Sequence, residues 1–158
     1  MKEVFKKTSG LQLKGKKMSE AKIIEIQWGG YYFCKEDDDN EEHGIIRLLD
    51  FNRYSYQSAL FSEKFSEKPE PETVTALSPF IGHVPIDARG ILNGTRELIA
   101  HKPLAPEDLE GYRMYLEHHE MPTGEIDQLF ANLIQYSKEP PLKLKLQIVN
   151  EELQIEEV

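Results

Sequence analysis

The stretch LKLKLQIVNEELQIEEV, residues 142–158, alternates apolar and polar side chains on both sides of a short polar break. Before the break, every second side chain is apolar: Leu142, Leu144, Leu146 and Ile148. That spacing is typical of a strand with one buried face. Asn150 and Glu151 are predicted to turn the chain, and Leu153 and Ile155 then continue the alternation. The stretch therefore predicts an antiparallel hairpin, and with it a fold built on an antiparallel sheet.

Residues 124–138, just before this hairpin, are predicted to form a helix. Their apolar side chains follow the i, i+3, i+4, i+7, i+8 spacing of one helical face: Ile126, Leu129, Phe130, Leu133 and Ile134. Thr123 is expected to cap the first turn. Pro140 and Pro141 prevent extension at the other end, because proline cannot continue a helix.

A second helix is predicted to begin near Pro106. Proline is tolerated in a first helical turn, and the acids Glu107 and Asp108 suit the positive end of the helix dipole. Four side chains then share one helical face: Leu109, Tyr112, Leu116 and His119. We expect that face to pack on the sheet.

Six further strands are indicated by short runs rich in β-branched and aromatic residues: 23–28, 31–34, 45–51, 54–61, 80–86 and 95–101. Gly29 and Gly30 predict a hairpin between the first two runs, because glycine supplies the positive φ of tight turns. Residues 62–73 contain two prolines and lack periodicity, which indicates an exposed connection. Residues 87–92 are expected to form a single helical turn.

Together these patterns predict an α+β fold, with an antiparallel sheet of six to eight strands and two helices packed on one face or at one end. A chain of 158 residues suits one hydrophobic core. Residues 18–158 are therefore expected to form a single domain. Residues 1–17 are interpreted as a basic, disordered arm that precedes it.

Charge is unevenly distributed along the chain. Residues 1–17 carry six lysines and one acid, a net +5, and the whole chain carries −9, so the remainder carries −14. Such a body repels phosphate backbones and anionic lipids, which argues against nucleic acid or a membrane as its partner. The one cysteine excludes an internal disulfide and indicates a reducing cytoplasm.

The stretch KEDDDNEEHG, residues 35–44, holds most of the local acid. Six acids fall within seven positions: Glu36, Asp37, Asp38, Asp39, Glu41 and Glu42. The stretch does not fit the calcium loop of helix-loop-helix proteins, which needs glycine at its sixth position and glutamate at its twelfth, and no metal site is predicted. Two interpretations stay open: a solvated loop, or a docking patch that attracts a cationic partner over a long range.

Aromatic residues crowd into the N-terminal strands, among them Trp28, Tyr31 and Tyr32. Neighbouring side chains on a strand point to opposite faces, so Tyr31 and Tyr32 are both buried only if another element covers the second face. Exposed rings are common anchors of protein interfaces. We therefore treat these three aromatics, together with the acids of residues 36–42, as candidate partner-binding residues.

Motifs for catalysis are absent from the sequence. It has no Gly-x-Ser-x-Gly elbow and no glycine-rich phosphate loop, and Cys34 lies in an aromatic strand where a thiol is usually a buried hydrophobe. No catalytic residue and no cofactor are predicted. An alternative small-molecule pocket is predicted around the most site-like polar residues: His83, Asp87, Arg89 and His101.

Residues 77–120 contain two short phrases, FIGHVP at 80–85 and AHKPL at 100–104. In these phrases the segment resembles bacterial toxin-immunity proteins of the Imm26-like kind, which tend to have an N-terminal β portion followed by hydrophobic-His-Val-Pro and His-x-Pro-Leu phrases. The resemblance covers a minor part of the chain and carries over no active residue. It implies an acidic protein that neutralises a toxin by blocking it.

The leading hypothesis is a non-catalytic bacterial protein of the cytoplasm that recognises a cationic protein, such as a nuclease toxin, and occludes it. A first alternative is a small-molecule enzyme, or an accessory subunit of a biosynthetic pathway, that uses the alternative pocket. A second alternative is a structural homodimer that associates through an exposed strand edge, such as the C-terminal hairpin.

Overall fold

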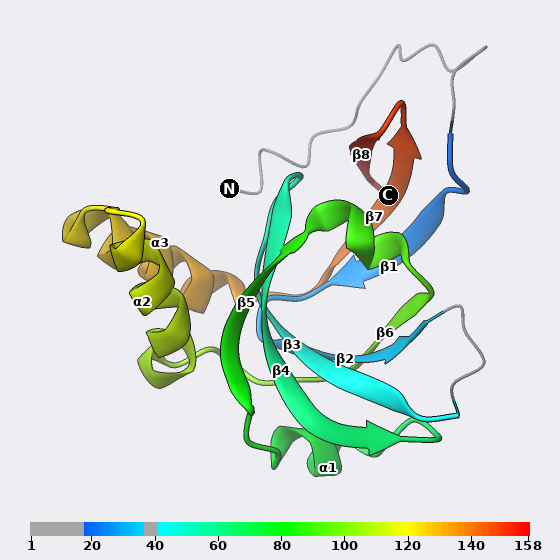
Figure 1. The fold of residues 1–158 in the computed structure, drawn as a ribbon, viewed down its shortest axis with the longest axis horizontal. Coiled ribbons are helices and arrows are strands. Elements are labelled where there is room, and N and C mark those ends of the chain that lie inside the picture. The colour runs from blue at the N-terminus through cyan, green and yellow to red at the C-terminus, as the bar shows by residue number, and fades with distance from the viewer. Residues whose placement is uncertain (1–17, 37–40) are drawn as a thin grey trace.

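The computed structural model describes residues 18–36 and 41–158 (Figure 1). The strands of this part of the chain are β1 (Lys22–Ile26), β2 (Gly30–Lys35), β3 (His43–Phe51), β4 (Ser55–Phe65), β5 (Ile81–Asp87), β6 (Thr95–His101), β7 (Leu142–Val149) and β8 (Glu152–Glu157). Its α-helices are α1 (Pro71–Thr75), α2 (Glu110–His118) and α3 (Thr123–Tyr136), and its 3-10 helices are η2 (Ala88–Leu92) and η3 (Pro106–Leu109).

The strands form two antiparallel sheets. One sheet has three strands in the order β1-β7-β8, and the other has five in the order β5-β4-β3-β2-β6. The predicted α+β class and the antiparallel pairing are confirmed, with eight strands in the described part of the chain. The strands divide into two sheets, whereas the sequence patterns predict one.

The hairpin predicted at Gly29 and Gly30 is wrong. β1 pairs with β7, while β2 pairs with β3 and β6, so the two glycines carry the chain from one sheet to the other. Gly29 has φ +79, and a Cβ built on it would lie 2.4 Å from the carbonyl oxygen of Lys102. A Cβ on Gly30 would lie 2.7 Å from a methyl group of Leu98. Close approach of the backbone therefore requires glycine at this crossover, as a tight hairpin turn would.

The predicted C-terminal hairpin is confirmed. Val149 pairs with Glu152, and the two residues between them, Asn150 and Glu151, have φ values of 50 and 69. Two consecutive left-handed residues make the type I′ turn whose twist matches that of the strands. The inward side chains of this hairpin are among the most buried in the protein: Leu144, Leu146, Leu153 and Ile155.

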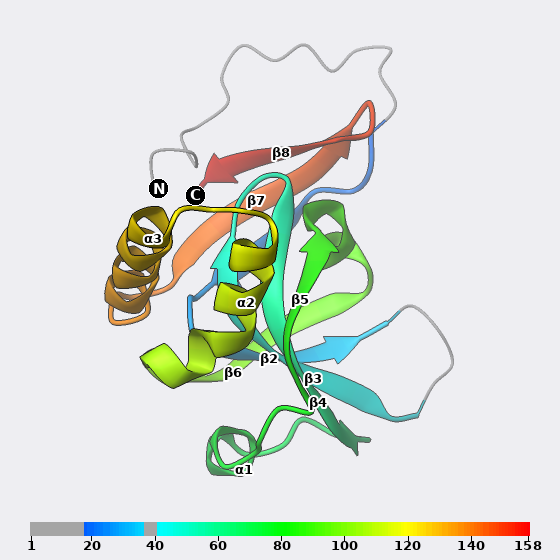
Figure 2. The ribbon, with the colours of Figure 1, turned by 60° about the vertical axis from the view of Figure 1, so that its left-hand side comes forward.

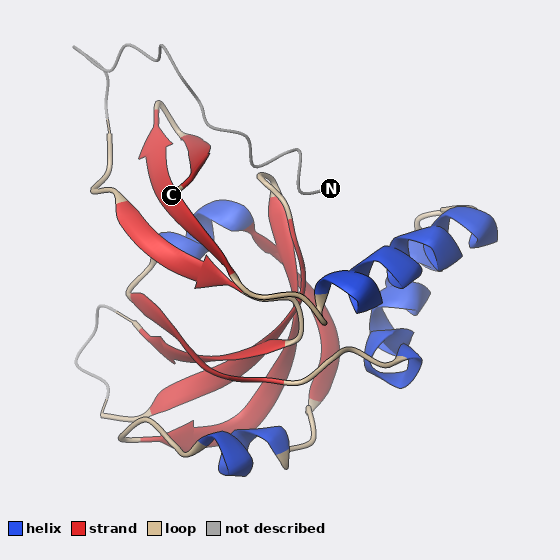
Figure 3. Cartoon of the chain, turned by 180° about the vertical axis from the view of Figure 1, so that it is seen from behind, coloured by secondary structure: helices blue, strands red, loops and turns tan. Residues whose placement is uncertain are grey.

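Helices α2 and α3 lie together at one side of the molecule, beside the strands (Figures 2 and 3). The periodicity predicted for α3 is confirmed, because Ile126, Phe130 and Leu133 are its buried residues. The predicted Thr123 cap is wrong: the helix begins after Pro122, which occupies the capping position without a side-chain hydrogen bond.

The connection predicted over residues 62–73 is in part regular structure. β4 continues to Phe65, and α1 begins at Pro71 (Figure 1). Both elements belong to a second apolar cluster, in which Val74 of α1 is completely buried and Phe65 packs at the margin. The segment is ordered because it covers one face of the five-stranded sheet.

The five-stranded sheet therefore has apolar side chains buried on both faces. The larger cluster joins the two sheets with α2 and α3, and it contains Tyr32, Leu48 and Phe130. The smaller cluster lies on the other face under α1, and it contains Tyr31 and Phe33. Consecutive residues of β2 thus enter different clusters, as strand geometry requires.

Candidate functional site

The aromatics predicted to be partner-binding anchors are buried, so that prediction is wrong. Trp28, Tyr31 and Tyr32 are only 2, 2 and 3 % exposed. The hydroxyl of Tyr32 donates to the carbonyl of Glu25 at 2.7 Å and accepts from the backbone N–H of Gln27 at 2.9 Å. The reason is the second cover that α1 provides, since it removes the free sheet face on which one of the tyrosines was expected to lie.

The acidic stretch falls partly outside the described residues, where Asp37, Asp38 and Asp39 lie. Glu36, Glu41 and Glu42 are described and are exposed. Arg96 of β6 pairs with Glu36 at 3.1 Å. No hydrogen bond or ion pair joins the side chain of Glu41 or Glu42 to any other described residue.

A groove of about 290 Å³ lies where the acidic stretch meets β2 and β3, and we call it the loop groove. Its polar lining includes Glu36 and Glu42, which come from the two ends of the stretch, and Lys64 of β4. Its apolar lining includes Ile46, Leu60 and Phe80. The loop groove therefore combines a polar rim, which includes two carboxylates and one lysine, with an apolar floor.

Phe80 is the residue of the loop groove that sequence reasoning misplaced. It was included in the strand predicted over residues 80–86, but β5 begins one residue later, and the Phe80 side chain is 65 % exposed. Its backbone N–H donates to the carbonyl of Leu60 at 2.9 Å, which fixes its position beside β4. An exposed phenyl ring on an ordered backbone loses little conformational entropy on contact with a partner.

Cys34 also lines the loop groove, but its thiol is not a reactive group. The side chain is 9 % exposed, and burial raises the pKa of the thiol to about 11. At neutral pH it is therefore protonated, and only the thiolate acts as a nucleophile. This agrees with the prediction that Cys34 serves as a small hydrophobe.

The alternative pocket predicted around His83, Asp87, Arg89 and His101 is wrong, because these residues do not converge. β5 and β6 occupy opposite edges of the five-stranded sheet, which separates His83 from His101. His101 is held by the carbonyl of Ser137, 2.5 Å from its Nε2. His83 and Asp87 share β5 but lie four residues apart, roughly 13 Å along a strand.

Asp87 and Arg89 form a local pair at the end of β5. The Arg89 guanidinium donates to both carboxylate oxygens of Asp87, at 3.0 and 2.7 Å, and these bonds lower the pKa of that carboxyl to about 2. The pair lines a shallow polar cavity of about 240 Å³ with Arg53 and Glu151. Neither histidine of the predicted pocket lines it.

A buried carboxylate lies at the junction of the sheets and α2. Asp50 is 3 % exposed and accepts hydrogen bonds from Trp28 Nε1 at 3.3 Å, Phe51 N at 2.8 Å and Tyr112 Oη at 3.2 Å. Burial raises the pKa of Asp50, although each of these donors opposes the shift. The ring of His83 stacks on Tyr112 with centroids 4.9 Å apart. Asp50 holds the core together and does not line the loop groove.

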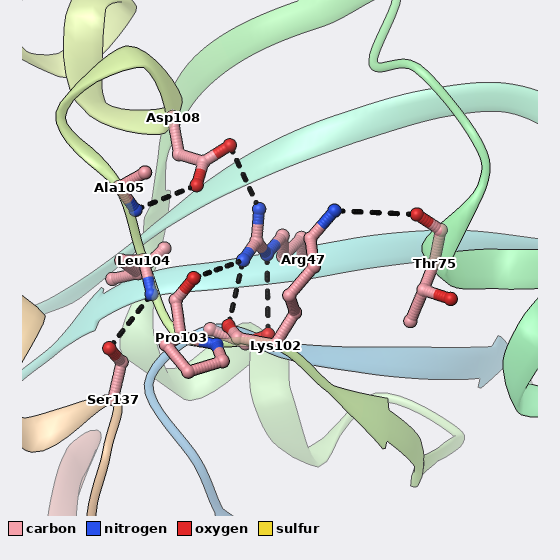
Figure 4. A network of polar contacts seen from close by, with 9 residues as sticks. Arg47, Thr75, Lys102, Pro103, Leu104, Ala105, Asp108 and Ser137 are labelled. Atoms are coloured by element: carbon pink, nitrogen blue, oxygen red, sulfur yellow. Dashed lines mark hydrogen bonds and ion pairs between the residues drawn. The ribbon is translucent and has the colours of Figure 1, made fainter.

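Arg47 of β3 lines a further cavity of about 300 Å³, which we call the Arg47 cavity. Figure 4 shows the polar contacts of Arg47. The Arg47 guanidinium donates from Nε to the carbonyl of Gly29 at 3.2 Å and from Nη2 to the carbonyl of Lys102 at 2.8 Å. Its Nη1 pairs with Asp108 at 3.1 Å, and Asp108 accepts from the N–H of Ala105 at 2.8 Å. A buried cation therefore joins β3, the crossover glycine and the segment that leads into α2.

No group of three or more His, Cys, Asp or Glu side chains suited to a metal ion is found within residues 18–36 and 41–158. In the same residues, no helix has the length and hydrophobicity to cross a bilayer. β8 lies at an edge of the three-stranded sheet, and dimerisation through this hairpin stays a prediction.

Comparisons with protein-family models, with curated proteins and with solved structures found no match to the chain. The resemblance of residues 77–120 to toxin-immunity proteins thus stays a prediction from sequence. Phe80 lines the loop groove, and Lys102 lines the Arg47 cavity.

Proposed function

We propose that this chain is a non-catalytic binding protein of the bacterial cytoplasm that recognises a cationic protein, such as a nuclease toxin, and blocks its active cleft. The proposal keeps the acidic stretch as the element that attracts the partner. It replaces the buried aromatics Trp28, Tyr31 and Tyr32 with Phe80 as the apolar anchor.

The observation that carries the proposal is the composition of the loop groove. Glu36 and Glu42 stand on its rim, and Phe80 is 65 % exposed beside an apolar floor. Interfaces gain most of their affinity from a few large apolar or aromatic anchors, while charges at the rim set the association rate and exclude wrong partners. Carboxylates of the acidic stretch beside an aromatic anchor suit a basic protein that has an apolar contact at its centre.

Charge supports the same choice of partner. Residues 18–158 carry −14, so they attract a basic surface over the length of the electrostatic field and repel nucleic acid. A nuclease has a basic cleft because it binds phosphates. The carboxylates of residues 36–42 would occupy that cleft in place of phosphates, and the Phe80 ring would take the position of a stacked base. Blocking the cleft inhibits the enzyme without any chemical step.

The experiment is a binding measurement with the product of the gene immediately upstream of the one that encodes this chain. The two proteins are co-expressed and purified, and association rates are measured at low and high salt, about 0.05 and 0.5 M. We expect a basic protein that binds, with an association rate that falls by at least about tenfold at high salt. An upstream product that is acidic, or that does not bind, contradicts the proposal.

Two pairs of variants locate the interface. The double variant Glu41→Gln/Glu42→Gln is expected to slow association severalfold, whereas Glu117→Gln/Glu125→Gln, which removes the same charge from exposed positions of the helical side, is not.

The apolar anchor is tested in the same way. Phe80→Ala is expected to weaken binding by about 2 kcal/mol, or about thirtyfold. The control is Met114→Ala, since Met114 is 70 % exposed on α2 and lies outside the loop groove. If a test variant and its control changed binding equally, in either of these two pairs, the interface would lie elsewhere.

A further inference from the structure

The Arg47 cavity contains polar side chains that make few or no contacts with other described residues. Tyr31 lines the cavity and is 2 % exposed, yet its hydroxyl forms no hydrogen bond with any described residue. The ring of Tyr31 is occupied, because the Arg47 guanidinium lies 4.9 Å from its centroid. A tyrosine hydroxyl that lines a cavity can donate to a ligand there.

A cation with unused donors lies at one side of the same cavity. Lys102 follows β6, and its ammonium group makes one long contact, 3.4 Å to the carbonyl of Thr75 (Figure 4). An ammonium group has three donors, so Lys102 keeps donors for another acceptor. Together with the Tyr31 hydroxyl, it forms a donor pair suited to a carboxylate.

Two carboxylates lie on the side of the cavity that η3 and α2 form. Glu107 and Glu110 line the cavity, and neither carboxylate has a hydrogen bond or ion pair within the described chain. Asp108, between them, is already paired with Arg47. The two free carboxylates suit a bound ammonium group.

The remaining wall is apolar. Leu49 and Phe61 contribute from the sheet, and Leu77 and Pro79 from the segment between α1 and β5. Ala59 lies directly opposite Arg47 on the neighbouring strand, and its small side chain leaves the floor open. An aliphatic group placed here would be removed from water.

We propose that the Arg47 cavity binds a small zwitterion of the amino-acid class, with an aliphatic side chain. Its carboxylate accepts from the Tyr31 hydroxyl and the Lys102 ammonium group, its ammonium group contacts Glu107 and Glu110, and its side chain packs on Leu77. The cavity volume of about 300 Å³ is at the lower end of the range for small-molecule sites, which suits an amino acid rather than a nucleotide. A ligand with only a negative charge would be repelled by Glu107 and Glu110, and a ligand with only a positive charge would be repelled by Lys102.

The experiment compares three ligands that differ only in charge. The purified full chain is titrated with L-leucine, with leucinamide, which lacks the carboxylate, and with N-acetyl-leucine, which lacks the ammonium group. Binding is followed by backbone amide NMR shifts. We expect L-leucine to give saturable shifts around residues 102–111 and to bind at least about tenfold more tightly than either derivative, since each derivative leaves one charged wall unpaired. Equal binding of leucinamide, or no saturable shift with leucine, overturns the proposal.

Tyr31→Phe provides a control for folding. The hydroxyl forms no hydrogen bond with a described residue, so we expect its removal to leave the thermal midpoint of the free chain unchanged but to weaken leucine binding about fivefold, the value of one hydrogen bond. Glu110→Gln is expected to weaken leucine binding as well, whereas Glu42→Gln in the loop groove does not. Unchanged affinity of Tyr31→Phe contradicts the assigned contact. If leucine does not bind but a basic partner protein does, the amino-acid site is refuted and the proposed function stands. Failure of the amino-acid site is therefore distinguishable from failure of the proposed function.

Discussion

Replacing Arg47 with methionine removes the charged group at the centre of the Arg47 cavity and keeps most of the aliphatic stem. The arginine side chain is 5 % exposed and makes an ion pair and two short hydrogen bonds to backbone carbonyls. Its loss removes one donor from each of those carbonyls and leaves Asp108 without its ion-pair partner, although Asp108 still accepts from the N–H of Ala105. The segment from Lys102 to Asp108 then loses its contacts with Arg47 but keeps other hydrogen bonds: Ser137 accepts from the N–H of Leu104 at 2.8 Å, and Gly29 accepts from the N–H of Lys102 at 3.4 Å.

The expected loss of stability in Arg47→Met depends on how far the partners of Arg47 are exposed to water. Removing one member of a buried ion pair costs about 3–5 kcal/mol, because the other charge is left without compensation. Here Asp108 is 26 % exposed, so water replaces part of the lost contact, and we expect the lower end, about 3 kcal/mol in the free energy of unfolding. For a chain of this size, that loss lowers the thermal midpoint by about 6–12 °C.

Urea unfolding followed by Trp28 fluorescence measures the effect, since Trp28 is the single tryptophan and is 2 % exposed when folded. Arg53→Met is the matched control, because Arg53 is exposed and pairs with no other described residue, and we expect it to change stability by less than about 0.5 kcal/mol. The double variant with Asp108→Asn should show a coupling energy of at least about 1 kcal/mol. A loss below about 1 kcal/mol for Arg47→Met, or no coupling, would refute the role assigned to Arg47.

Three further predictions concern the core and the turns. Burial raises the pKa of Asp50 above its ordinary value of 3.8, so its contribution to stability is fully present below about pH 4 and is lost as the pH rises through the folded pKa. The wild type should therefore lose stability relative to Asp50→Asn as the pH rises from about 4 to 8, and a relative gain would contradict the cause assigned to the shift. Gly94 has φ +65, and a Cβ there would lie 1.9 Å from the Lys35 carbonyl oxygen, so Gly94→Ala should cost more than about 2 kcal/mol in urea unfolding. Gly82→Ala, whose Cβ meets nothing within 4 Å, should be nearly neutral, and a similar cost at both positions would show that the close approach is relieved easily. With a thiol pKa of about 11, Cys34 should react with a disulfide reagent at pH 8 only after unfolding, and fast labelling of the native protein would place it at the surface.

The elements that could be predicted from the sequence are those with a complete local pattern. The alternation of β7 and β8 and the helical spacing of α3 are each contained within fewer than twenty residues, and the structure has all three. The sign and position of the charge could be predicted in the same way, because they need no knowledge of contacts. The carboxylates on the rim of the loop groove follow from that pattern.

Other features depend on partners that lie far away along the chain. Gly29 and Gly30 are equally compatible with a hairpin and with a crossover, because both need residues that accept a positive φ or leave room for another segment of backbone. Only the pairing of β1 with β7 decides between the two. The burial of Tyr31 depends on α1, a short helix with one buried residue, Val74, and little helical periodicity. Residues 71–75 have no local pattern that predicts this cover, and without it Tyr31 is expected on a free sheet face.

Residue order alone determined the strand and helix periods, the antiparallel class and the strongly acidic body, because each is a property of neighbouring side chains. Tertiary structure decided how the strands of the described residues divide between sheets, which aromatics are buried and where Phe80 is left exposed. It also brought Tyr31, Arg47 and Lys102 from β2, β3 and the end of β6 to the wall that Glu107 and Glu110 build. These outcomes depend on contacts between residues tens of positions apart, which local periodicity does not specify.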